Sequence, residues 1–164
     1  MRQIIVYTLL FFTFLIPVAN AEETEQFAVV MKLEQGPVGV VFEIVGGDAE
    51  SLHKAINRIK GYMKKIKLRF PDSKFVVVSH GMEQFSLLKE KEDDHPELHK
   101  QVQSLVKEDQ TPLQVCGSFA EMMGVEDKEF LSIVNVVASG PAQIEFYKYK
   151  GYRLVEMDLE FVDD

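Results

Sequence analysis

The sequence alternates between short apolar runs and segments with the apolar spacing of a helix, and this alternation restricts the fold more than any other feature. The apolar runs cover 38–45, 75–78, 113–115, 133–138 and 153–157. Strands that alternate with helices form a mostly parallel sheet covered by helices on both faces. No linker, repeat or low-complexity segment divides the pattern. We therefore predict an α/β fold with one domain over 22–164.

The longest helix is predicted after Asp48, a residue type that caps helix N-termini. Leu52, Ile56, Ile59 and the apolar residues around them recur at the 3.6-residue period of one helix face. Shorter helices are predicted at 82–90, from Pro96, after Cys116 and from Pro141, since proline suits the first position of a helix.

A hairpin is a further expectation at the start of the domain. The apolar segment 27–33 and the β-prone run 38–45 are separated by the turn residues Gly36 and Pro37. Two strands joined by so short a turn pair in antiparallel fashion. The sheet is therefore expected to carry an antiparallel edge strand here.

The first 21 residues have the features of a secretory signal peptide. Arg2 supplies a positive start, 4–16 is an apolar run, and Ala19-Asn20-Ala21 is an A-x-A cleavage site. The run is shorter than the ~20 residues that a membrane-spanning helix needs. We expect cleavage after Ala21, a periplasmic or secreted protein, and no membrane association once the signal is removed.

The charge of the chain excludes several classes of partner. With 26 acidic and 18 basic side chains, the net charge is −8. Nucleic-acid binding needs a basic surface, so nucleic acid is not an expected partner. No phosphate loop or dinucleotide fingerprint occurs, and Gly46-Gly47-Asp48 alone is too weak to indicate one, so no cofactor is expected.

Small or reactive residues stand where four apolar runs end. The pairs are Gly46-Gly47, His80-Gly81, Cys116-Gly117 and Ser139-Gly140. In an open α/β sheet, ligands bind in the crevice outside the carboxyl ends of the strands. Glycines can also simply mark loops. Four such pairs in corresponding places predict a site that brings together His80, Cys116 and Ser139.

Cys116 is the one cysteine of the chain, so no internal disulfide and no cysteine-based zinc cluster is possible. A free cysteine is often a buried apolar residue. Cys116 stands instead where a strand is predicted to give way to a helix, and free N–H groups there would lower the pKa of its thiol. The N–H groups of Gly117 and Ser118 are the expected donors.

The histidines allow two further hypotheses. His80 could act as a base or hydrogen-bond donor near the thiol, or only cap a strand end. His95 and His99 lie four residues apart, on one face of a predicted helix, which is a spacing that can bind a metal. Because Pro96 replaces the glutamate of the zinc-protease motif, a solvated helix face is the stronger interpretation, and no metal site is assigned.

The order of these segments resembles the DsrE/DsrF-like family of small sulfur-relay proteins. The resemblance extends over about 38–157. It is carried by Val40-Val41-Phe42-Glu43-Ile44, Val76-Val77-Val78-Ser79-His80-Gly81 and Val115-Cys116-Gly117-Ser118-Phe119, with Gly140 to Tyr152 at the end. The segment after Cys116 lacks the Arg-Gly ending of the cytoplasmic relay members. It is closer to an exported branch of the family.

The resemblance implies a flavodoxin-like three-layer fold, assembly into a homotrimer or homohexamer, and sulfur carried as a persulfide on Cys116. Partners would be small sulfur species or a sulfur donor or acceptor protein. From their places at the strand ends, the expected catalytic residues are Cys116 and His80, and the expected ligand-binding residues are Gly81, Gly117, Ser118, Ser139 and Gly140. Two alternatives remain open, an oligomeric ligand-binding or scaffold module with a structural cysteine, and histidine-based metal binding.

Overall fold

A five-stranded sheet forms the centre of the protein in a computed structural model that describes residues 23–157. Its order is β4-β3-β2-β1-β5, and each strand runs parallel to its neighbours. The predicted signal peptide lies outside the described residues. The strands are β1 (Gly39–Ile44), β2 (Lys74–Ser79), β3 (Leu113–Cys116), β4 (Asn135–Val137) and β5 (Tyr152–Met157).

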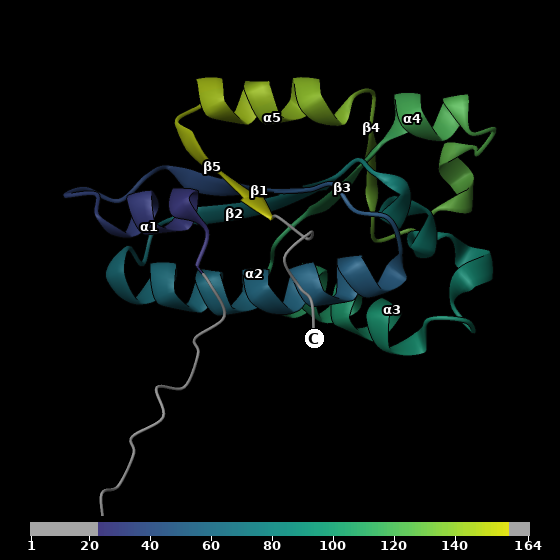
Figure 1. Cartoon of the computed structure of the whole chain (residues 1–164), viewed down its shortest axis with the longest axis horizontal. Helices are drawn as coiled ribbons and strands as arrows, with labels where there is room; N and C mark the ends of the chain where they lie inside the picture. Colours follow the sequence, from purple (N-terminus) through teal and green to yellow (C-terminus); the bar gives the residue numbers. More distant parts are fainter. Residues whose placement is uncertain (1–22, 158–164) are drawn as a thin grey trace, which may run out of the picture.

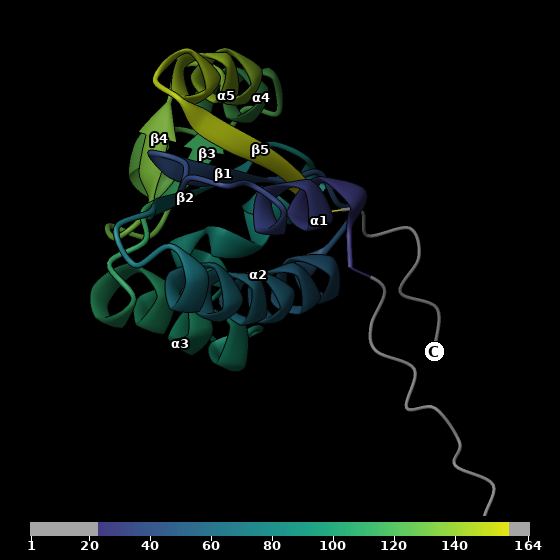
Figure 2. The same ribbon diagram turned by 90° about the vertical axis from the view of Figure 1, so that its left-hand side faces the viewer.

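Helices cover both faces of the sheet, as an all-parallel sheet requires (Figures 1 and 2). One face carries α2 (Ala49–Arg69) and α3 (Pro96–Gln103), which continues as the π-helical turn η3 (Ser104–Glu108). The other face carries α4 (Gly117–Met122) and α5 (Gly140–Tyr149). The remaining helical pieces are α1 (Glu25–Met31) and the 3₁₀ turns η1 (Met82–Leu87), η2 (Lys89–Lys91) and η4 (Asp127–Glu129). The predicted α/β sandwich is confirmed.

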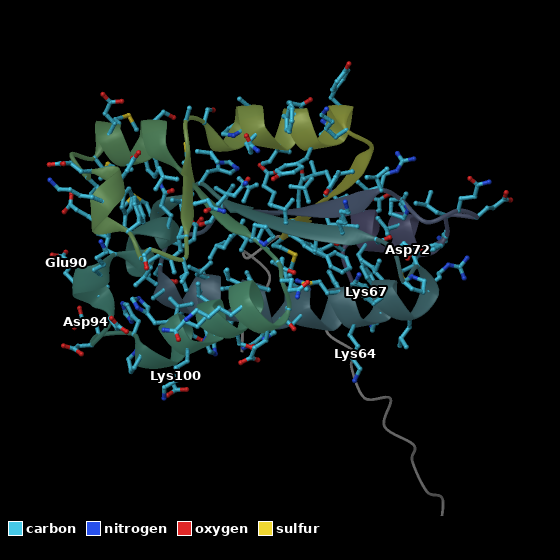
Figure 3. All side chains as sticks on the ribbon, turned by 180° about the vertical axis from the view of Figure 1, so that it is seen from behind. Lys64, Lys67, Asp72, Glu90, Asp94 and Lys100 are labelled. Atoms are coloured by element: carbon cyan, nitrogen blue, oxygen red, sulfur yellow. The ribbon has the colours of Figure 1, made fainter. Side chains whose placement is uncertain are left out.

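The two faces of the sheet carry apolar clusters of different size. The α2 face carries the main core, in which Phe42, Ile44 and Ile56 are fully buried. The α5 face holds a small cluster of Val41, Val76, Val78 and Ile144. The outer surfaces of α2 and α3 are charged, with Lys64 and Lys100 directed away from the sheet (Figure 3). Because the apolar cluster on the α5 face is small, polar side chains can lie next to the sheet on that face.

The start of the domain differs from the prediction. Residues 25–31 form helix α1, so the expected antiparallel hairpin is wrong, and β5 occupies the edge of the sheet beside β1. Thr24 caps α1 by accepting a hydrogen bond from the N–H of Phe27. Phe27 and Val30 are buried three residues apart, which is a helical spacing. Stacking of Phe27 on Tyr62 at 3.9 Å fixes the helix against α2.

The register of the strands places three side chains on one face of the sheet near its carboxyl edge. β2 and β3 pair Ser79 with Val115, so the next residues, His80 and Cys116, lie beside each other at the carboxyl edge. Side chains alternate along a strand. Val41 and Val78 face α5, so the residues two positions further along, Glu43 and His80, face it too. Gln114 also reaches α5, which places Cys116 on the same face.

Candidate functional site

Gly140, the first residue of α5, brings His80 and Cys116 together. A Cβ at this position would lie 2.7 Å from Cβ of His80 and 3.4 Å from Cβ of Cys116. Both side chains therefore lie directly against the backbone where α5 begins. Any larger residue here would separate them, which gives this glycine a packing role at the site.

The Cys116 thiol is nearly enclosed, with 4% of the residue exposed, yet its surroundings are polar. Its Sγ lies 3.2 Å from Oγ of Ser118. Burial raises the pKa of the Cys116 thiol, but the N–H of Gly140, the Ser118 hydroxyl, the N–H of Phe119 and the charge of His80 together lower it below its usual range. A cysteine that only fills space in an apolar core would have a raised pKa. The surroundings of Cys116 therefore stabilise the thiolate more than an apolar core would.

His80 is paired with a carboxylate on its other side. Its Nε2 lies 2.7 Å from Oε1 of Glu43, and both side chains are largely shielded from solvent. The hydrogen bond to Glu43 raises the pKa of His80. Burial opposes this shift, and the charges of Glu43, Glu83 and Cys116 add to it. The imidazole is therefore charged over a wider pH range than a free histidine.

Glu83 supports the two loops that frame His80. The carboxylate is fully buried and accepts hydrogen bonds from the hydroxyl of Ser79 at 2.7 Å, the N–H of Gly81 at 3.0 Å and the N–H of Gly46 at 2.6 Å. These contacts link the ends of β1 and β2. Gly81, one of the residues predicted to bind a ligand, therefore uses its N–H within the protein.

Gln84 supports the backbone of the cysteine itself. Its Oε1 accepts a hydrogen bond from the N–H of Cys116 at 2.8 Å, and the side chain is fully buried. Its Nε2 is buried and has no acceptor among the described residues. Both N–H donors of this carboxamide are thus unpaired among the described residues.

Two of the residues predicted to bind a ligand have different contacts from those expected. The N–H of Ser118, expected to face the sulfur, donates instead to the carbonyl oxygen of Ala138 at 3.0 Å. The Ser118 hydroxyl and the N–H of Phe119 take that role. The Ser139 hydroxyl caps α5 by accepting a hydrogen bond from the N–H of Ala142.

Gly117 and Ser118 also border an open groove beside the edge strand. Acidic side chains from α4 and the segment that follows it lie around this groove. Its lining includes Gly117, Ser118, Glu121, Glu126, Asp127 and Val137. Cys116 itself does not line the groove, and Ser118 is the lining residue whose hydroxyl contacts the sulfur.

Sequence reasoning missed Glu43, Glu83 and Gln84 as members of the site. Glu43 carried a usable signal, because it is the single charged residue within the apolar run 38–45. A charge inside a buried strand needs a partner. Glu83 and Gln84 lie in a polar turn that gives no comparable signal.

The paired histidines do not form a site. His99 is 1% exposed, and one of its ring nitrogens donates to the carbonyl oxygen of Ser86 at 2.8 Å. His95 precedes α3 as its N-cap residue. Within residues 23–157, no group of three or more His, Cys, Asp or Glu side chains is arranged to hold a metal ion. The same range contains no helix with both the length and the apolar character needed to cross a membrane.

Comparison with known proteins supports the fold alone. No family model matches the sequence, and no curated protein matches it. A solved structure of MTH1491, a protein of unknown function from Methanobacterium thermoautotrophicum, is similar with a TM-score of 0.57 at 19% identity. The similarity covers 72% of this chain and 97% of that one. At this identity the likeness establishes a shared α/β architecture and nothing about activity.

Proposed function

We propose that this protein carries sulfane sulfur as a persulfide on Cys116, in the manner of the DsrE/DsrF-like proteins that its sequence resembles. The observation that carries the proposal is the environment of the thiol. A buried sulfur with N–H groups, a hydroxyl and an imidazole around it is stabilised as an anion. A thiolate is the form of cysteine that attacks another sulfur.

The transfer needs only groups that the site already holds. The Cys116 thiolate attacks the outer sulfur of a donor persulfide, R–S–SH, and a new Sγ–S bond forms as the donor S–S bond breaks. The leaving thiolate takes the proton held on His80, so that R–SH departs and His80 becomes neutral. The sulfane sulfur keeps its oxidation state, and no external oxidant or reductant is consumed.

Sulfur chemistry fits the site better than acyl transfer. An acyl-transfer enzyme needs free N–H groups about 3 Å from the developing oxyanion, separate from the nucleophile. Here the N–H groups of Gly140 and Phe119 face the sulfur itself, and that of Ser118 is used by Ala138. The donors therefore stabilise charge on sulfur.

We also propose where the protein acts, with which partners and in what assembly. The A-x-A site at Ala19-Asn20-Ala21 supports export to the periplasm or outside the cell, with no membrane contact after cleavage. The donor or acceptor is a small sulfur compound or a partner protein. A homotrimer or homohexamer is proposed from the resemblance alone.

A second candidate is a binding or scaffold module in which Cys116 is structural. The exposure of only 4% at Cys116 favours it, because an enclosed thiol reacts slowly. Alkylation of the native protein separates the two functions. Rapid modification of Cys116 by a small alkylating reagent supports the carrier, and complete protection in the folded state supports the module.

The test of the proposal is the intact mass of the purified protein after exposure to a low-molecular-weight persulfide. We expect wild-type protein to gain whole sulfur atoms and Cys116→Ser to gain none. Circular dichroism of both proteins checks that the variant is folded. Equal gain in both proteins, or no gain in wild type, would contradict a persulfide on Cys116.

A further inference from the structure

Glu43 lies on the same face of the sheet as His80 and Cys116, level with Val78, and nothing in its own strand explains a carboxylate there. Its neighbours Phe42 and Ile44 are fully buried in the core on the opposite face. A charged group in such a strand costs free energy unless it is paired. Its partner is His80, 2.7 Å away on the adjacent strand.

The geometry of this pair limits what the imidazole can do. Nε2 is engaged by Glu43, so Nδ1 is the ring nitrogen left for exchange of a proton at the sulfur. Rotation of the ring would break the bond to Glu43, and on the other side the base of the imidazole lies close to the backbone of Gly140, where an added Cβ would be 3.1 Å from Cγ of His80. The ring is held from both sides.

We propose that Glu43 is a positioning residue that fixes the orientation and the charge of His80 beside Cys116. This inference rests on the proposed sulfur-carrier function and extends it to a carboxylate–imidazole–thiol relay across β1, β2 and β3. The S–H bond of Cys116 breaks as an N–H bond forms at Nδ1 of His80, Glu43 stays ionised and stabilises the resulting imidazolium, and the step needs no oxidant or reductant.

The groups that face His80 are few. Glu43 faces it from β1, Glu83 from the turn after β2 and Cys116 from β3. Gly140, Pro141 and Ala142 open α5 on the remaining side and carry no charge. Among the described titratable groups, Glu43 alone makes a side-chain hydrogen bond to the imidazole.

Glu156 provides a matched control for Glu43. It is the register partner of Glu43 on β5, so both side chains leave the same face of adjacent strands. Glu156 is exposed, and its carboxylate accepts a hydrogen bond from Gln26 instead of His80. The variants Glu43→Gln and Glu156→Gln therefore remove the same charge from neighbouring positions.

The experiment is the pH profile of Cys116 alkylation by iodoacetamide, measured on the full folded protein. Glu43→Gln should shift the profile to higher pH and slow alkylation at about pH 6.5 by about three- to tenfold, since one pKa unit changes the thiolate fraction about tenfold. Glu156→Gln should react like wild type. An unchanged profile in Glu43→Gln, or an equal shift in Glu156→Gln, would overturn the positioning role.

A measurement on wild type covers the case in which Glu43→Gln does not fold. Ring ¹⁵N shifts of His80 at high pH report which nitrogen keeps its proton. The relay requires the Nε2–H tautomer, bonded to Glu43. The Nδ1–H tautomer would overturn it.

These readouts separate the relay from the carrier function. Alkylation and ¹⁵N shifts involve no sulfur loading. A shifted profile in Glu43→Gln with no persulfide on wild type would keep the relay and reject the carrier. Persulfide loading of wild type with an unchanged alkylation profile in Glu43→Gln would keep the carrier and reject the relay.

Discussion

Gly140→Ala tests whether the close approach of α5 holds the site together. The added Cβ would lie 2.7 Å from Cβ of His80, a distance that real Cβ contacts essentially never show, and 3.1 Å from Cγ of the same ring. The imidazole or the start of α5 must move. We expect His80 to separate from Cys116 and the pH profile of thiol alkylation to shift upward.

The expected size of the effect follows from two opposing contributions. Overpacking of a closely packed position costs about 1–3 kcal/mol. Alanine is favoured over glycine in a helix interior by about 1 kcal/mol, and by less at the first helical position. The free energy of unfolding should therefore fall by about 1–2 kcal/mol, which urea denaturation measures.

Gly61→Ala is the matched control, because it makes the same change in α2 at an exposed position with no atom within 4 Å of the new Cβ. It should stabilise the protein by about 0.5–1 kcal/mol and leave the alkylation profile unchanged. If Gly140→Ala were as stable as Gly61→Ala and its thiol reacted like that of wild type, a Cβ at position 140 would not crowd His80, contrary to our expectation.

Three further predictions concern buried polar groups. Glu83→Gln should lower the free energy of unfolding by about 2–3 kcal/mol in urea, since the carboxylate accepts hydrogen bonds from three donors; a loss below about 0.5 kcal/mol would refute this support. The folded-state pKa of His80 is raised, so its stabilising contribution is present below the ordinary value of 6.5 and is lost as pH rises through the raised value. His80→Asn should therefore destabilise by about 1 kcal/mol more at about pH 6 than at about pH 9, and an equal loss at both would contradict the ion pair. In a calorimetric titration with Zn²⁺, wild type and His99→Ala should give the same result, because His99 is buried and bonded to Ser86.

The location of the site followed from the sequence because it depends on local signals. Small or reactive residues follow the apolar runs, and a parallel sheet brings the carboxyl ends of its strands to one edge. His80 and Cys116 could therefore be placed together without knowledge of their contacts. The structure places them on adjacent strands, one position beyond the paired residues Ser79 and Val115.

The contacts of the supporting residues could not be predicted, because they depend on register and on the packing of turns. Glu43 reaches His80 only because β1 lies beside β2 with its odd-numbered side chains toward α5. Gln84 binds the backbone of Cys116 from a turn 32 positions earlier in the chain. The lone charge in the run 38–45 indicates that Glu43 needs a partner, but only the three-dimensional fold determines which residue that is.

The prediction for 27–33 was wrong because short apolar segments are ambiguous. The run has enough β-branched and aromatic residues for a strand, and a turn follows it. Tertiary contacts decide the outcome, since Phe27 stacks on Tyr62 and Thr24 caps the helix. In the structure Phe27 and Val30 are the buried residues of the segment, a spacing that the continuous apolar run 27–31 does not reveal.

The most direct test of the account is the discharge of sulfur from the loaded protein. Wild-type protein is loaded with a small persulfide, freed of excess donor and then exposed to a small thiol, while intact mass is followed with time. The account predicts that the added sulfur leaves Cys116 and appears as the persulfide of the acceptor, one for one. Sulfur that never loads, or that stays on the protein while the thiol remains unmodified, would contradict a carrier.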